Sequence, residues 1–186
     1  MSIEVIRTEL EGVIVVQPKV FGDARGFFLE THHQGKYAEA GIVGPFVQDN
    51  HSRSQRGVVR GLHYQLKHPQ GKLVYCVRGA IFDVAVDIRR GSATFGKWVG
   101  AELSEENRRQ LYVPHGFAHG FMVLSDWADV YYKCTDVYHP GDDYGVFWAD
   151  EEIGIAWPGD TAGALVSEKD AVNPRLREVE PSLLPK

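Results

Sequence analysis

Three side chains of different chemistry lie close together in the stretch from Gly57 to Lys72. Arg60 offers a guanidinium, His63 an imidazole and Lys72 an ammonium, and all three stand among apolar residues that favour strands. An imidazole exchanges a proton near neutral pH, and the two cations can bind an anion or stabilise a developing negative charge. This set is hard to explain by packing alone, so the stretch predicts a site that combines a base with anion binding.

Strand geometry decides whether these groups can act together. Strict alternation would place Arg60 and His63 on opposite faces of a strand. Gly61 lies between them, and a glycine inside a strand often marks a β-bulge or a close approach of another backbone. One extra residue there would turn Arg60 towards the His63 side. We therefore expect a bulge at Gly61 and one cavity that contains both side chains.

Composition limits the classes of protein. The chain has 186 residues, of which 44% are hydrophobic, as expected for one globular domain spanning 1–186. A formal charge of -5 gives no cationic field for nucleic acid or an anionic membrane, and no run is long enough for a transmembrane helix. The only cysteines, Cys76 and Cys134, lie in apolar strand-like runs and predict two buried thiols. Without a leader-like N-terminus, these features favour the cytoplasm.

Short strands dominate the rest of the pattern. In the N-terminal part we expect two strands within 1–18 joined at Glu11 and Gly12, a turn-rich segment at 21–30, a short helix at 33–40, and a strand at 45–51 followed by a polar loop at 52–56. A hairpin of 72–78 and 81–88 follows the central stretch. Further strands are expected at 98–103, 110–113, 122–124 and 129–135, before a proline-containing tail at 174–186. Many short strands, almost no helix and no alternation of strands with helices predict an all-β jelly-roll barrel with short peripheral helices.

Clustered histidines in a small β-barrel first suggest a metal-binding cupin. His63 and His119 stand where the two cupin motifs place histidines, but Gln65 takes the place of the second histidine and no glutamate follows. Two imidazoles fall short of the three protein ligands that a catalytic zinc or iron site normally shows. We therefore expect a barrel of cupin shape without a metal or other cofactor, whose histidines are free for proton chemistry.

Eight motifs in order give the sequence a resemblance to one family, the dTDP-4-dehydrorhamnose 3,5-epimerases. The motifs are DARGFFLE at 23–30, QDN at 48–50, RGLHYQ at 60–65, PQGK at 69–72, FDVAVD at 82–87, PxGFAHGF at 114–121, YKCT at 132–135 with Tyr138, and SEKD at 167–170. The resemblance runs nearly end to end and implies a cofactor-independent isomerase. Its expected substrate is a dTDP-4-keto-6-deoxyhexose, epimerised at C3 and C5 next to the 4-keto group.

The resemblance implies four catalytic residues. Epimerisation removes a proton α to a ketone on one face and returns a proton on the other. His63 matches the base and Asp170 the carboxylate that orients it. Tyr132 matches the acid, because a phenol with a pKa of about 10 stays protonated until it donates. Lys72 would lie at the ketone oxygen, where a cation favours the developing enolate.

Binding residues are implied in the same way. Arg25 and Arg60 match pyrophosphate contacts, Lys169 could add a third cation, and His119 matches a substrate contact. Tyr138 matches the ring that stacks on thymine, aided by Phe21. The residues expected to supply polar contacts to the base and the sugar are Glu30, Gln48, Asp49 and Asn50. Asp143 stands where the family often has glutamate, which shortens its reach.

The sequence leaves the assembly and the product open. The family forms homodimers that exchange N-terminal strands, and residues 13–16 are a plausible exchanged element. Single-site 3- or 5-epimerases share all the motifs above. A 4-keto-sugar 3,4-isomerase should lack the Arg60 to His63 motif and the Tyr132–Lys133 pair. A nucleotide-sugar-binding module without catalysis and a metal-dependent cupin share the barrel as well, and fold alone does not decide between these classes.

Overall fold

Two antiparallel sheets form the body of the molecule. The computed structural model describes residues 3–186, so Met1 and Ser2 of the predicted first segment lie outside the described residues. The larger sheet has the order β1 (Ile3–Arg7), β2 (Ile14–Pro18), β10 (Gln110–Val113), β7 (Lys72–Arg78), β12 (Trp127–Cys134), β5 (Gln48–Gln55). The smaller has the order β13 (Asp143–Gly145), β6 (Val59–Gln65), β11 (Phe117–Val123), β8 (Ala80–Asp87), β9 (Trp98–Ser104). The predicted all-β jelly-roll class is confirmed.

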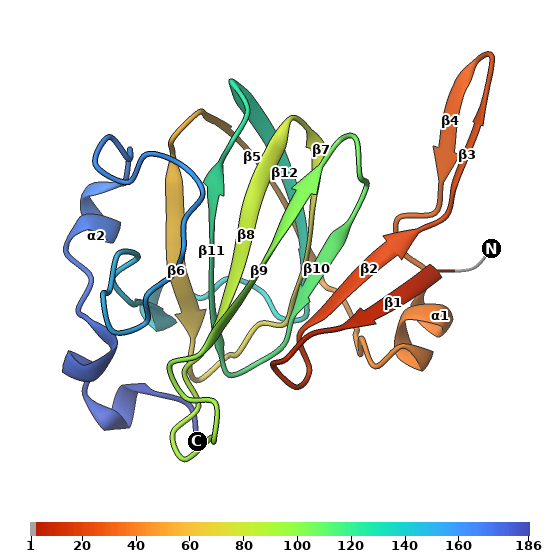
Figure 1. The fold of residues 1–186 in the computed structure, drawn as a ribbon. Helices are drawn as coiled ribbons and strands as arrows, with labels where there is room; N and C mark the ends of the chain where they lie inside the picture. Colours follow the sequence, from red (N-terminus) through yellow and green to blue (C-terminus); the bar gives the residue numbers. More distant parts are fainter. Residues whose placement is uncertain (1–2) are drawn as a thin grey trace.

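Strand β8 shows why both faces of the smaller sheet are covered. Ile81 and Ala85 belong to the core between the two sheets, whereas Val84 and Val86 belong to a second apolar cluster on the outer face. That outer cluster includes Leu176 of the C-terminal segment, and in Figure 1 this blue segment runs alongside β6. Burial on both faces explains why β8 is nearly continuous in apolar residues.

Two sequence predictions about the larger sheet were wrong. Strands β7 and β8 do not form a hairpin, because β7 pairs with β10 and β12 whereas β8 pairs with β9 and β11. The chain turns at Gly79, with φ of 74°, and passes from one sheet to the other. The expected polar loop at 52–56 is largely strand, because β5 pairs with β12 along its whole length up to Gln55.

Peripheral elements complete the fold. Strands β3 (Val20–Asp23) and β4 (Gly26–Leu29) form a hairpin that projects away from the barrel in Figure 1. Helix α1 (Gln34–Glu39) follows, as predicted, and begins after the N-cap residue His33. Helix α2 (Glu168–Ala171) and the 3₁₀ turns η1 (Pro140–Asp142), η2 (Leu176–Glu178) and η3 (Pro181–Leu183) lie in the last third of the chain. Within residues 3–186, no helix has the length and apolarity needed to span a membrane.

Strand β2 does not have the open edge expected of residues 13–16. It pairs with β1 on one side and with β10 on the other, and its residues Ile14 and Val16 are almost fully buried. The described chain therefore gives residues 13–16 a place inside its own sheet. The projecting β3–β4 hairpin is the N-terminal element that stands away from the body.

Candidate active site

The predicted bulge is present on β6. His63 lies opposite His119 of β11, and Arg60 lies opposite Phe121, so three steps along β6 match two steps along β11. At Gly61 the two backbones approach so closely that a Cβ atom there would lie 2.6 Å from Gly120 Cα. The extra residue brings Arg60 and His63 to the same cavity, as the sequence predicted.

A buried carboxylate holds His63. Asp170 Oδ1 lies 2.6 Å from His63 Nε2, and Asp170 Oδ2 accepts a hydrogen bond of 3.3 Å from the backbone N–H of Gly61. Ser167 caps the short helix α2 and accepts the Asp170 N–H, which fixes this acid at the helix start. Burial raises the pKa of Asp170, but the hydrogen bonds from His63, Gly61 and Ser167 outweigh it and lower the pKa overall. Asp170 is therefore an ionised partner for the imidazole.

The cation and the phenol come from the other sheet. Lys72 begins β7 and lies opposite Cys134 of β12, while Tyr132 lies two residues earlier on β12 and so on the same face. Both Lys72 and Tyr132 line the cavity that His63 reaches from β6 of the smaller sheet and Asp170 from α2 beside it. The two sheets thus present an imidazole–carboxylate pair on one side of the cavity and an ammonium and a phenol on the other.

Enclosure shifts the pKa values of these two groups in opposite directions. Burial lowers the pKa of Lys72, because it penalises the charged ammonium, although Cys134, Asp143 and Asp83 act against this. Burial raises the pKa of Tyr132, because it penalises the phenolate. Among the described residues, Lys72 has no ion-pair partner, so its charge is available to a ligand in the cavity.

Two adjoining hollows make up the site. The larger has a volume of about 500 Å³ and the smaller about 230 Å³, and they share His63, Lys72, Tyr132 and Asp143. Sequence reasoning gave no role to several of the residues that line them, namely Ser52, Val58, Val59, Tyr64, Gln65, Gln70, Phe121, Leu165, Val166 and Ser167. Their positions follow from the pairing of strands distant in sequence, which no local motif reveals.

Further polar groups line the cavity around these four. Arg60 donates from Nε to Ser54 Oγ at 3.0 Å, and its guanidinium lies at the larger hollow. Lys169 forms an ion pair with Asp143, which also accepts a hydrogen bond of 3.0 Å from the hydroxyl of Tyr138. Tyr138 lines the smaller hollow, and Arg60 and Lys169 line the larger one. Asp143 lines both hollows and connects Tyr138 to Lys169.

A second histidine–carboxylate pair lies beside the first. His119 Nε2 lies 2.8 Å from Asp83 Oδ1, and both side chains are buried. Burial raises the pKa of Asp83, against the opposing effects of His119 and Lys72, and its Oδ2 has no hydrogen-bond partner among the described residues. Asp83 is fully buried, and it contacts the cavity through His119, which lines the larger hollow.

Strand alternation separates three neighbours that sequence reasoning grouped together. Gln48 and Asn50 line the smaller hollow. Asp49 points to the opposite face of β5, where it accepts a hydrogen bond of 2.7 Å from Lys133 Nζ. Asp49 therefore does not line the cavity of the described chain, and its binding role stays a prediction.

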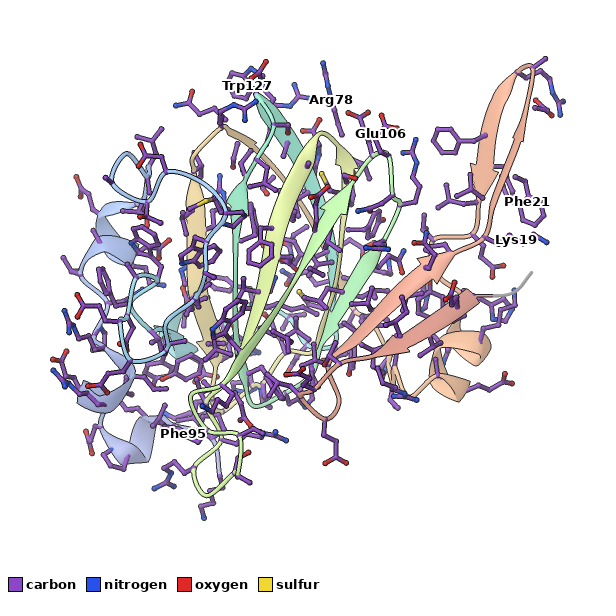
Figure 2. The ribbon with its side chains drawn as sticks, in the orientation of Figure 1. Lys19, Phe21, Arg78, Phe95, Glu106 and Trp127 are labelled. Atoms are coloured by element: carbon purple, nitrogen blue, oxygen red, sulfur yellow. The ribbon has the colours of Figure 1, made fainter. Side chains whose placement is uncertain are left out.

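Three predicted binding residues lie away from the cavity. Phe21 and Arg25 belong to the β3–β4 hairpin, and Figure 2 shows Phe21 on this hairpin at a distance from the barrel. The Arg25 side chain is 89% exposed and pairs with Asp23, while Glu30 pairs with Lys36 at 2.5 Å. The described chain does not by itself bring these three to the other site residues.

The donor groups do not fit the cupin metal pattern. The His63 and His119 Nε2 atoms are each engaged by a carboxylate, at 2.6 and 2.8 Å. Gln65 stands at the remaining histidine position, and its amide bonds to backbone groups of His68, Val137 and His139. Among residues 3–186, neither His63 nor His119 belongs to a group of three His, Cys, Asp or Glu ligand atoms that lie within 4.8 Å of one another.

The jelly-roll barrel and its facing groups are those of a cupin-like protein whose cavity contains an imidazole, a carboxylate, an ammonium and a phenol. Comparison with family models makes this more specific. Residues 7–178 match the model of the dTDP-4-dehydrorhamnose 3,5-epimerases, and the chain belongs to this family.

Individual relatives agree with this placement. A dTDP-4-dehydrorhamnose 3,5-epimerase from Methanothermobacter thermautotrophicus is 53% identical over 174 residues, which cover 93% of this chain and 94% of the relative. A crystal structure of the Legionella pneumophila 3,5-epimerase in complex with dTDP-4-keto-L-rhamnose is 50% identical, with a TM-score of 0.96, and the match covers 100% of this chain and 98% of that one. A Streptomyces niveus dTDP-4-dehydrorhamnose 3-epimerase is 44% identical over 163 residues, covering 87% and 78%.

Proposed function

We propose that the chain epimerises dTDP-4-dehydro-6-deoxy-D-glucose at C3 and C5 to dTDP-4-dehydro-L-rhamnose, in dTDP-L-rhamnose biosynthesis. The observation that carries this proposal is the placement of a carboxylate-bound imidazole on one sheet and of an ammonium and a phenol on the other, around one cavity. Inverting a carbon next to a ketone needs a base on one face of the sugar and a proton donor on the other. The family membership of the chain supports the same reaction.

His63 is the proposed base. Asp170 engages Nε2, which holds one tautomer and leaves Nδ1 to take the proton from carbon. When the imidazole becomes an imidazolium, the adjacent carboxylate stabilises the new charge. Asp170 is therefore a positioning residue that acts through His63.

Lys72 is the proposed partner of the ketone oxygen. Removing the α proton moves negative charge onto this oxygen, and an ammonium already in place stabilises the enolate more than the neutral ketone. Burial penalises the ammonium and lowers the pKa of Lys72, so the negative charge of an enolate in the cavity would in turn stabilise the charged form of Lys72.

Tyr132 is the proposed acid. The raised pKa of its phenol keeps the proton in place until the enolate carbon accepts it. The proton that arrives is then not the proton that left, since base and acid lie on different sheets. This predicts that hydrogen from solvent enters the product.

Nucleotide binding is proposed for the polar lining. Arg60 and Lys169 provide cations for the pyrophosphate, and His119 contacts the sugar. Tyr138 offers an aromatic face for thymine beside the amides of Gln48 and Asn50. Asp143 is already bonded to Tyr138 and Lys169, so its proposed role is to position these two side chains.

We further propose a homodimer in which the β3–β4 hairpin completes the site of the partner subunit. This hairpin carries Phe21 and Arg25, and its Phe27 and Phe28 are 55% and 61% exposed. Exposed aromatics next to an exposed guanidinium suit an anionic aromatic ligand or a protein surface.

We propose a single functional domain over residues 1–186, because both sheets contribute side chains to one cavity. The two buried free thiols of Cys76 and Cys134 support a cytoplasmic location.

Proton exchange tests the proposed reaction. The protein is incubated with dTDP-4-keto-6-deoxyglucose in deuterated water, and NMR follows C3 and C5. We expect deuterium at both carbons, and no label with His63→Ala, whose fold is checked by circular dichroism and by retained dTDP binding. Label at C3 alone, the positional activity that the Streptomyces niveus relative's name describes, would contradict double epimerisation. Tight dTDP-sugar binding without any label would indicate a binding module.

A further inference from the structure

A second group of chemically reactive side chains lies beside the cavity. His68 follows β6, and Asp136 and His139 follow β12, and one ligand atom of each lies within 4.8 Å of the others. The two imidazole rings stack with centroids 3.7 Å apart, and His68 Nδ1 lies 3.9 Å from Asp136 Oδ2. None of these three residues takes part in the proposed epimerisation.

Buried side chains hold the backbone on which this group stands. Gln65, only 7% exposed, donates to the carbonyl of His68 at 2.7 Å and accepts the N–H of His139 at 2.8 Å. Gln70 donates to the carbonyl of Asp136 at 2.8 Å. Asp142, only 3% exposed, accepts the N–H of His68 at 2.7 Å. All three candidate ligands therefore stand on loops that are cross-linked by hydrogen bonds before any ligand binds.

The donor atoms suit a borderline transition metal. Two imidazoles and one carboxylate are a common zinc ligand set, with bonds of about 2.0–2.2 Å. Ligand atoms on such an ion lie roughly 3.4 Å apart by tetrahedral geometry, so side-chain rotations that bring these atoms up to about 1.4 Å closer together would close the present spacing. The His68 side chain is 47% exposed and that of Asp136 is 39% exposed, which leaves solvent access for a fourth ligand.

We propose that His68, Asp136 and His139 form a binding site for a divalent transition metal such as Zn²⁺, separate from the catalytic groups. The site joins the loop after β6 to the loop after β12. Tyr138 lies between Asp136 and His139 in sequence and lines the smaller hollow. A bound ion would therefore restrain the segment that carries Tyr138, at the edge of the cavity.

Titration calorimetry with ZnCl₂ tests the site. The protein is prepared without a polyhistidine tag and treated with a chelator. We expect saturable binding of one ion to the unmodified chain, and an affinity reduced roughly tenfold or more in His68→Asn and in His139→Asn. The matched control is His33→Asn, which also removes an exposed histidine. It should bind like the unmodified chain, since asparagine replaces the N-cap of α1 well.

The experiment distinguishes the loss of a metal ligand from the loss of the fold. Circular dichroism and retained dTDP binding establish that each variant is folded, so that a lost metal affinity reports the ligand set. Equal affinities in all variants, or binding weaker than about 1 mM in the unmodified chain, would overturn the proposal. Because the readout is heat of metal binding, the result does not depend on whether the chain epimerises its sugar.

Discussion

At the scale of single residues, burial in the cavity shifts the pKa values of Lys72 and Tyr132 in opposite directions. The ammonium of Lys72 becomes easier to deprotonate, and the phenol of Tyr132 becomes harder to deprotonate, because burial lowers the pKa of the first and raises the pKa of the second. Lys72 therefore loses its charge at a lower pH than an exposed lysine, and Tyr132 keeps its proton to a higher pH than an exposed tyrosine. The alkaline limit of the activity should report the lysine.

The first prediction concerns this limit. In the unmodified enzyme, kcat should fall with rising pH at values below the ordinary lysine range, because neutral Lys72 no longer stabilises the enolate. Lys72→Met should reduce kcat by about 10²- to 10³-fold at neutral pH. Lys72→Arg should keep part of the activity and lose the early alkaline fall, because arginine stays protonated. The measurement is kcat against pH for the three proteins, and an unchanged alkaline fall in the arginine variant would contradict the assignment.

Sequence reasoning succeeded for residues whose chemistry is carried by a motif. His63, Lys72, Tyr132 and Asp170 were all expected at one site, and the structure places them around one cavity. Asp49 lies on the other face of β5, because its neighbours Gln48 and Asn50 face the cavity and a strand alternates its side chains. The roles of these residues remain predictions that activity measurements must test.

At the scale of elements, the contact between β6 and β11 sets the shape of the site. The backbones of Gly61 and Gly120 lie in close contact, with no room for a Cβ atom between them, and φ of Gly61 is 120°. A side chain at Gly61 would press into the backbone of β11 and would also be forced into a conformation that favours glycine. The bulge that aligns Arg60 with His63 depends on this approach.

The second prediction compares two glycines. Gly61→Ala should lower the free energy of unfolding by about 3 kcal/mol or more, because strain and overpacking add. Gly57→Ala is the control: its φ is 77°, but a Cβ there meets no atom within 4 Å. It should cost about 1 kcal/mol from backbone conformation alone. Denaturant unfolding measures both values, and equal losses would show that the close approach to Gly120 is unimportant.

Element types were easier to predict than their partners. Most strands and helix α1 lie near their expected positions, because local alternation and turn residues specify them. The supposed hairpin at Gly79 is a corner between two sheets, since a tight glycine turn permits either connection and only the distant partners β9 to β12 decide. The strand character of residues 52–55 likewise depends on pairing with β12 and has no local apolar signal.

At the scale of the whole molecule, the catalytic groups and the N-terminal hairpin occupy different places. Figure 1 shows β3 and β4 extending away from the two sheets. If the hairpin serves the partner subunit, each site combines His63 of one chain with Arg25 of the other.

The third prediction uses mixed dimers. Co-expressed His63→Ala and Arg25→Ala chains should recover about a quarter of the unmodified activity, since random pairing makes half of the dimers mixed and each has one intact site. The matched control combines His63→Ala with Asp170→Ala. Both residues belong to the same chain's pair, so no intact site can form and activity should stay at background. If the first mixture behaves like the control, Arg25 does not act across subunits.

The contact between His63 and Asp170 also has a consequence for biosynthesis of the enzyme itself. The two residues are 107 positions apart, and every barrel strand precedes Asp170 in the chain. At a translation rate of about 5–20 residues per second, the ribosome adds Asp170 roughly 5–20 s after His63. A nascent chain therefore completes the strands of its barrel before it completes its base, and a polypeptide that ends before Asp170 lacks both the carboxylate partner of His63 and the C-terminal residues that cover the smaller sheet.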